Sequence, residues 1–282
     1  MYQIIDGKAV SAYVKQQVKD EVAKLAENGS VPALAVIIVG NDPASKVYVG
    51  NKKKACEMTG MKSIEYALSE NTSEAELLEL IDKLNKDSEV NGILCQLPLP
   101  EHINEDKIID AIAPEKDVDG FSAVNVGKIW LGKYEISPCT PMGVIELLDY
   151  YKIPLEGKNC VIVGRSNIVG KPMAALLLER NATVTVCHSR TKDLASFTKN
   201  ADVIVAAVGR ADFITADMVK EGAVVVDVGI NRLDNGKLCG DVDFENVKEK
   251  ASFITPVPGG CGPMTIAVLM KNTLVAYKNQ NK

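Results

Sequence analysis

The stretch Asn159–Pro172, NCVIVGRSNIVGKP, joins an apolar strand, a glycine turn and the start of a helix. Gly164 allows a tight turn after the strand, and Gly170 allows the helix to pack closely. Backbone N–H groups at a helix start attract an anion, so the turn predicts a site for a nucleotide phosphate. The pattern departs from G-x-G-x-x-G, because Ser166 holds the middle glycine position and the closing glycine comes one residue late. Ordinary turn glycines in some other α/β protein are the alternative interpretation.

The end of the next strand, Thr183–Ser189, indicates which dinucleotide binds. An enzyme that uses NAD carries Asp or Glu about twenty residues after the glycine turn, where the acid binds the ribose hydroxyls. Here the strand ends in Ser189 and Arg190, and Arg165 lies in the turn. Hydroxyl and guanidinium groups without an acid suit a 2′-phosphate, so we expect NADP rather than NAD. Alternatively, both arginines are surface charges.

The same turn does not match a hydrolase nucleophile elbow. It lacks the second glycine of G-x-S-x-G, and His102 and His188 are the only histidines that could serve as an imidazole base. Ser166 is therefore expected to bind the phosphate or to stabilise the turn.

Polar residues in the N-terminal half form a second candidate set. Tyr48 and Lys52 are four residues apart on a predicted helix and project from one face, while the two lysines that follow point elsewhere. Gln96 interrupts the apolar run Gly92–Pro100, where a buried amide needs partners or a ligand. Lys52 in a solvated helix face and Gln96 as a satisfied core amide remain the alternatives.

The elements that position these residues alternate along the chain. Apolar, β-branched runs predict strands of a parallel sheet at Leu34–Gly40, Ser63–Ser69, Gly92–Pro100, Asn159–Val163, Thr183–Ser189, Ala201–Gly209 and Ala223–Ile230. Helices are expected near Ser45–Met58, Ser73–Asp87, Asn104–Ile112 and Met264–Tyr277, and Ser73 with Glu76 predicts a capping box.

This order predicts an α/β fold with two α/β lobes flanking a cleft, the second a Rossmann-like doubly wound parallel sheet. We assign residues 1–138 to the first lobe, with the C-terminal helix 263–282 packing back on it, and residues 139–262 to the second. The change of lobe is placed between the run Val126–Lys133 and a helix with Pro141 in its first turn.

Length and composition exclude several classes of protein. The 282 residues, 46% hydrophobic and 24% charged, are ordinary for a soluble globular protein. A net charge of −5 argues against nucleic acid as the main partner. The sequence shows neither an apolar run of the ~18 residues that span a bilayer nor a signal-peptide pattern at its start, so we expect a cytoplasmic protein with no membrane partner.

The seven cysteines are scattered and odd in number. They show neither a C-x-x-C pair nor histidines at ligand spacing, so the sequence implies no disulfide framework and no metal. Cys261 lies in a glycine-rich loop, where either a reactive exposed thiol or a thiol without a role is expected.

Taken in order, these strings resemble the bifunctional methylenetetrahydrofolate dehydrogenase/methenyltetrahydrofolate cyclohydrolase family over nearly the whole chain. The strings are DPAS with Tyr48 and Lys52, QLPLP from Gln96, KDVDG from Lys116, PCTP from Pro138, VGRS from Val163, TPVPGG from Thr255 and GPMT from Gly262. The chain departs from the family loop at Cys261, where the family has valine.

The resemblance implies roles for individual residues. Lys52 corresponds to the catalytic lysine with Gln96 as its partner, Tyr48 to the aromatic residue that stacks on the folate, and Asp119 to the acid that holds the pterin edge. The loop along the folate corresponds to Pro258, Gly259 and Gly260, and the NADP contacts to Gly164, Arg165, Ser166, Ser189 and Ile230. From the residues alone, Asp117 and Asp119 are also ordinary turn formers.

The resemblance implies two reactions in which these residues take part. The first passes a hydride from 5,10-methylenetetrahydrofolate to NADP, and the second adds water to the methenyl product to give 10-formyltetrahydrofolate. With histidine almost absent, Lys52 is the expected proton shuttle. The resemblance also implies a homodimer. A different Rossmann dehydrogenase, or a nucleotide-binding module without catalysis, would explain the glycine turn but leave Tyr48, Lys52 and Gln96 without roles.

Overall fold

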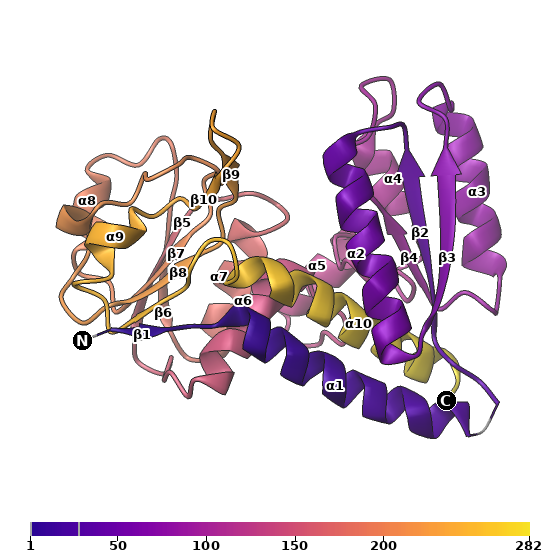
Figure 1. Ribbon diagram of the computed structural model, residues 1–282, viewed down its shortest axis with the longest axis horizontal. Helices are drawn as coiled ribbons and strands as arrows, with labels where there is room; N and C mark the ends of the chain where they lie inside the picture. The colour runs from indigo at the N-terminus through magenta and orange to yellow at the C-terminus, as the bar shows by residue number, and fades with distance from the viewer. Residues whose placement is uncertain (1, 28) are drawn as a thin grey trace. The chain divides into compact units, whose positions relative to one another are not determined.

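The computed structural model describes residues 2–27 and 29–282, which form two compact units (Figure 1). The described residues up to Ser11, together with Thr140–Thr265, form the unit that we call the six-stranded unit after its sheet. Ala12–Cys139 and Ile266–Lys282 form the three-stranded unit. Each contains parallel strands alternating with helices, which confirms the predicted α/β class.

The sheet of the six-stranded unit is entirely parallel. Its strands lie in the order β1 (Gln3–Ile4), β11 (Phe253–Ile254), β8 (Val224–Asp227), β7 (Val203–Ala206), β5 (Asn159–Val163) and β6 (Thr183–Cys187). The helices are α6 (Cys139–Tyr150), α7 (Gly170–Glu179), α8 (Leu194–Thr198), α9 (Phe244–Val247) and the 3-10 turn η1 (Ala216–Met218), and β9 (Asn231–Arg232) pairs antiparallel with β10 (Leu238–Cys239).

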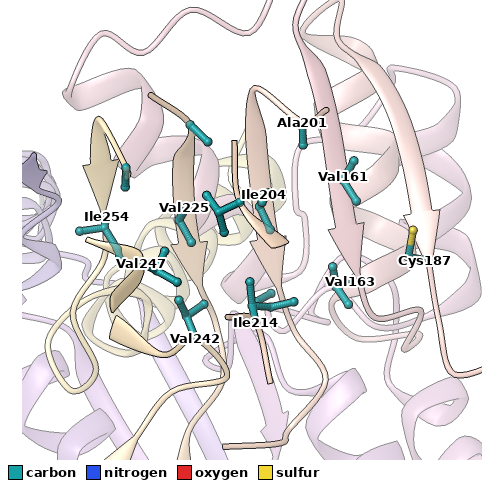
Figure 2. Close-up of a cluster of buried hydrophobic side chains, with 14 residues drawn as sticks. Val161, Val163, Cys187, Ala201, Ile204, Ile214, Val225, Val242, Val247 and Ile254 are labelled. Carbon is teal, nitrogen blue, oxygen red and sulfur yellow. The ribbon is translucent and has the colours of Figure 1, made fainter. Parts of the chain in front are cut away.

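The strand order determines where a ligand binds in this unit. The chain runs from β5 to β6 on one side, then crosses back to place β7 on the other side of β5. In such sheets, ligands bind outside the carboxyl ends of the strands at the point where the order reverses. Apolar side chains hold the sheet together, and Figure 2 shows Val161, Ile204 and Val225 among them, each at most 1% exposed.

The three-stranded unit contains parallel strands in the order β3 (Lys62–Leu68), β2 (Ala33–Val39) and β4 (Gly92–Cys95). Its helices are α2 (Pro43–Thr59), α3 (Glu74–Lys86), α4 (Glu105–Ala111) and α5 (Ala123–Trp130). The predicted capping box of α3 is present, since Ser73 and Glu76 exchange hydrogen bonds. The chain passes from one unit to the other within α6 and within two long helices, α1 (Gly7–Ala26) and α10 (Cys261–Gln280).

The start of the chain differs from the predicted lobe boundaries. Strand β1 pairs with β11, so the first described residues belong to the six-stranded unit rather than to the lobe predicted for residues 1–138. Gly7 follows this strand, and a Cβ there would lie only 1.7 Å from the carbonyl oxygen of Gly260. Because each strand is two residues long, neither leaves an apolar repeat in the sequence.

No described helix combines the length and the hydropathy needed to cross a membrane.

Candidate active site

Helix α2 carries Lys52 and begins at a well-capped end. Pro43 occupies the first turn, and the Asp42 carboxylate accepts a hydrogen bond from the Ser45 N–H at 2.7 Å. Along the helix, the Lys52 side chain is 8% exposed, whereas Lys53 and Lys54 are exposed to solvent. The run of lysines is therefore not a uniform solvated face, and one ammonium group is directed into the protein.

Gln96 lies where strand β4 has just ended. Its backbone N–H donates to the carbonyl of Ile37 on β2 at 2.8 Å, which fixes its position at the carboxyl edge of the sheet. Its side-chain Oε1 accepts a hydrogen bond from Lys52 Nζ at 2.8 Å, and its Nε2 donates to the Leu97 carbonyl at 2.7 Å. The structure thus brings together the lysine and the amide that the sequence singled out separately.

Asp119 belongs to the same electrostatic environment. Withdrawal from water raises the pKa of Asp119 to about 6, and the Lys52 ammonium opposes this shift. Its neighbour Asp117 is a turn former, because its carboxylate accepts the N–H groups of Gly120 and Ser122 at 3.0 and 2.8 Å. The partly buried carboxyl of Asp119 interacts instead with the side chains of Lys52 and Cys139.

The raised pKa of Asp119 makes stability depend on pH. Between about pH 4 and pH 6, the folded protein holds a proton that the unfolded chain has released, so stability falls as the pH rises through this window. Asp119→Asn cannot ionise and should raise the free energy of unfolding at pH 7.5 by about 1–3 kcal/mol. Urea unfolding at pH 7.5 and pH 4 measures this gain, which should shrink at the lower pH. Asp110→Asn, on an exposed helix position, is the matched control; an Asp119→Asn gain that is equal at both pH values contradicts the assignment.

Tyr48 lies one helical turn before Lys52 and is 44% exposed. An aromatic ring this exposed contributes little to the core. Its position next to the buried lysine suits it to contact a ligand.

The turn after β5 has no space for a side chain at either of its glycines. Gly164 has φ of 131°, and a Cβ there would lie 2.1 Å from the Ala207 carbonyl oxygen at the end of β7. A Cβ at Gly170 would lie 2.3 Å from the Gly164 carbonyl oxygen. Ser166 Oγ accepts hydrogen bonds from the Val169 and Gly170 N–H groups at 3.1 and 3.3 Å, so it stabilises the start of α7.

A cavity of about 310 Å³ lies beside this turn, at the carboxyl ends of β5, β6 and β7. Arg165 and Ser189, two of the residues expected to bind the phosphate of NADP, both line it, and that role stays a prediction. Arg190 is exposed and does not line the cavity.

His188 and Arg210 also line this cavity. The sequence patterns predicted a cofactor role for neither residue. The Arg210 guanidinium lies 4.6 Å from the centroid of the Phe213 ring. Both residues follow strands of the sheet, β6 and β7 respectively. Their position after parallel strands could have indicated a cofactor role, because ligand contacts gather at the carboxyl ends of such strands.

The loop with Pro258, Gly259 and Gly260 belongs to the six-stranded unit, where it lines a second cavity of about 170 Å³ together with Ile230. Cys261 lines the same cavity but is only 4% exposed, and burial raises the pKa of its thiol. A buried thiol that keeps its proton is a poor nucleophile. The hypothesis of an exposed, reactive Cys261 is therefore wrong.

Comparisons with known proteins all identify the same family. Two family models match the chain: the catalytic domain of tetrahydrofolate dehydrogenase/cyclohydrolase over residues 5–119 and its NAD(P)-binding domain over residues 138–281. A Campylobacter hominis protein named Bifunctional protein FolD is 61% identical over 280 residues, which are 99% of both chains.

Solved structures agree with these matches. The crystal structure of the bifunctional FolD methylenetetrahydrofolate dehydrogenase/cyclohydrolase from Campylobacter jejuni has a TM-score of 0.97 and 55% identity, covering 99% of each chain. The Trypanosoma brucei enzyme, solved with its NADP cofactor and an inhibitor, has a TM-score of 0.95 and 37% identity, covering 100% of this chain and 99% of that one.

Proposed function

Because the chain belongs to the tetrahydrofolate dehydrogenase/cyclohydrolase family, we propose that Lys52 and Gln96 form the centre of its folate chemistry. The protein oxidises 5,10-methylenetetrahydrofolate to 5,10-methenyltetrahydrofolate with NADP and hydrolyses that product to 10-formyltetrahydrofolate. The observation that carries the assignment of residues is the hydrogen bond from the buried Lys52 Nζ to Gln96 Oε1.

The residues around the glycine turn fit NADP. Gly164 and Gly170 let the backbone of the turn pack closely, and Arg165 with Ser189 offers a guanidinium and a hydroxyl to a 2′-phosphate. When bound, NADP accepts the hydride. The protein aligns the reactants, because transfer requires the two reacting atoms to approach within about 3–3.5 Å.

On the folate side, Tyr48 stacks on the substrate and Asp119 binds the amino-pyrimidine edge of the pterin. A carboxylate suits that edge, which presents parallel N–H donors. The raised pKa of Asp119 means that the carboxylate is ionised only above about pH 6, so folate binding through it should weaken below that pH. Pro258, Gly259 and Gly260 provide the backbone along the substrate, and Ile230 contacts the cofactor.

For hydrolysis, water attacks the methenyl carbon, and the new C–O bond leaves a proton to be removed. The Lys52 amine takes this proton and returns it to the folate nitrogen as the C–N bond breaks, while the adduct hydroxyl loses its proton to solvent as the formyl C=O bond forms. Gln96 Oε1 fixes the direction of the Lys52 amine through their hydrogen bond. The net reaction consumes one water and releases one proton.

Three further assignments belong to the proposal. The three-stranded unit, Ala12–Cys139 with Ile266–Lys282, binds folate, and Thr140–Thr265 of the six-stranded unit bind NADP. The chain forms a homodimer; strand β6, at an unpaired sheet edge, offers free backbone groups to a second copy. The protein is cytoplasmic, because all seven cysteines are free, which is typical of a reducing compartment.

An absorbance assay tests the function directly. Purified protein given methylenetetrahydrofolate and NADP should produce NADPH at 340 nm and then 10-formyltetrahydrofolate. The controls omit the folate or replace NADP with NAD, which should react more slowly. A protein that binds NADPH but yields neither product would be a nucleotide-binding module, and the proposed function would be wrong.

A further inference from the structure

Two buried aspartates in the six-stranded unit have no part in the reactions above. Asp227 ends strand β8 and is 3% exposed; Asp241 follows strand β10 and is 0% exposed. None of the ion pairs among the described residues includes either one. A buried carboxylate without a cation is costly unless hydrogen bonds replace its water, so their partners reveal what they do.

Asp241 binds the backbone of the segment that follows β7. Its Oδ2 accepts hydrogen bonds from the N–H groups of Val208 and Gly209 at 2.6 and 3.0 Å, and its Oδ1 accepts one from Arg210 at 2.8 Å. Consecutive N–H groups converging on one point are an anion-binding arrangement. Here the protein's own carboxylate is the anion, and it fixes three successive residues of the loop.

Asp227 holds Asp241 in place. Its Oδ1 accepts the N–H groups of Gly229 and Asp241 at 2.9 and 3.0 Å, and its Oδ2 accepts that of Val242 at 2.9 Å. The segments after β8 and after β10 are thereby tied to one carboxylate.

Two glycines make this arrangement possible. A Cβ at Gly229 would lie 2.2 Å from Cγ of Asp241, and a Cβ at Gly240 would lie 1.8 Å from Oδ2 of Asp227. Each carboxylate therefore packs against the backbone beside the other aspartate. The sequence must keep glycine at both positions for the pair to form.

The loop held by Asp241 is one wall of the cavity beside the glycine turn. Ala207, Val208 and Arg210 line that cavity opposite the end of β5, and the Ala207 carbonyl is the atom that a Cβ at Gly164 would strike. Asp241 itself does not line the cavity. Asp241 lies behind this wall, and its carboxylate binds the backbone N–H groups that determine the shape of the cavity.

We propose that Asp241 is a positioning residue for the NADP site and that Asp227 orients it. The inference rests on the proposed placement of NADP beside Gly164. Asp241 acts on the cofactor through Val208, Gly209 and Arg210, so it affects cofactor affinity and hydride transfer. Hydrolysis of the methenyl substrate needs no NADP and should not depend on it.

Asp241→Asn tests the proposal. The amide keeps the shape but has one acceptor oxygen, and its NH2 group opposes N–H donors. Since hydrogen bonds to a charged acceptor are the strong ones, we expect the Kd for NADPH to rise at least about tenfold and dehydrogenase kcat/KM to fall with it. Cyclohydrolase activity on methenyltetrahydrofolate without NADP should stay within about twofold, which also shows that the variant is folded.

Asp243→Asn is the matched control, because this acid is near Asp241 in the chain and partly exposed, and its carboxylate accepts a hydrogen bond from the side chain of Asn246. It should leave both activities and the Kd for NADPH unchanged. NADPH fluorescence titration measures binding without turnover, so failure of the parent protein to oxidise folate would contradict the proposed function separately.

If Asp241→Asn keeps its hydrolase activity and its parental Kd for NADPH, the proposal is wrong. Should that variant fail to fold, Asn231→Ala decides the question, since it leaves the Asp241 carboxylate in place and removes the Nδ2 donor that lies 2.9 Å from Asp241 Oδ1 and 3.1 Å from the Gly240 carbonyl oxygen. We then expect a smaller rise in the Kd for NADPH, of about threefold, and an unchanged Kd overturns the proposal.

Discussion

Replacing Lys52 by methionine should lower cyclohydrolase activity by about 10²- to 10⁴-fold, the usual contribution of a general acid–base group. Methionine keeps an unbranched apolar stem of similar length and removes the amine, so packing around this 8% exposed residue should survive. Gln96 Oε1 loses its donor but retains a path to solvent, because its side chain is only partly buried.

Dehydrogenase activity should fall much less in this variant. In the proposed mechanism hydride transfer moves no proton through Lys52, so loss of the amine should affect this step only through the orientation of the folate. Methenyltetrahydrofolate should therefore accumulate when the variant is given methylenetetrahydrofolate and NADP. Following the methenyl and formyl products in the same reaction separates the two steps.

Lys53→Met is the matched control, because Lys53 is adjacent on α2 but exposed. It should leave both activities near the parent values. Near-parental hydrolysis of methenyltetrahydrofolate by Lys52→Met would mean that the buried amine is structural, and the proposed proton transfer would have to be abandoned.

The sequence could predict Lys52 because helical geometry is local. A spacing of four residues places Tyr48 and Lys52 on one face without any knowledge of the rest of the fold. Gln96 was visible for a similar reason, since an amide within an apolar run needs a partner. The structure adds which partner it has: the 2.8 Å contact joins residues 44 positions apart, and no local pattern specifies it.

The features that the sequence did not predict depend on contacts between distant segments. Strands β1 and β11 are two residues each and exist because they pair with one another and with β8. The sequence patterns indicated nothing about Arg210 and Asp241, whose hydrogen bond forms only because the ends of β7 and β8 lie side by side. The burial of Cys261 could not be predicted either, because a glycine-rich sequence does not indicate whether a side chain is accessible to solvent.

We propose that Arg165 binds the 2′-phosphate of NADP, so Arg165→Ala should weaken NADP binding by about 10- to 150-fold, the loss expected for a charge-assisted contact of about 1.5–3 kcal/mol. The Arg165 side chain is exposed, so the lower part of this range is expected. NAD lacks the 2′-phosphate and should lose little affinity. Fluorescence titrations with NADPH and NADH give the two dissociation constants for each variant.

Two other arginines make the test specific. Arg190→Ala alters an exposed guanidinium that does not line the cavity, so it should cost less NADPH affinity than Arg165→Ala. Arg210 does line the cavity, but its guanidinium already packs over the Phe213 ring. An equal loss of NADPH and NADH in Arg165→Ala would show that Arg165 does not bind the 2′-phosphate. A loss confined to NADPH in Arg210→Ala would then assign that contact to the loop that Asp241 holds.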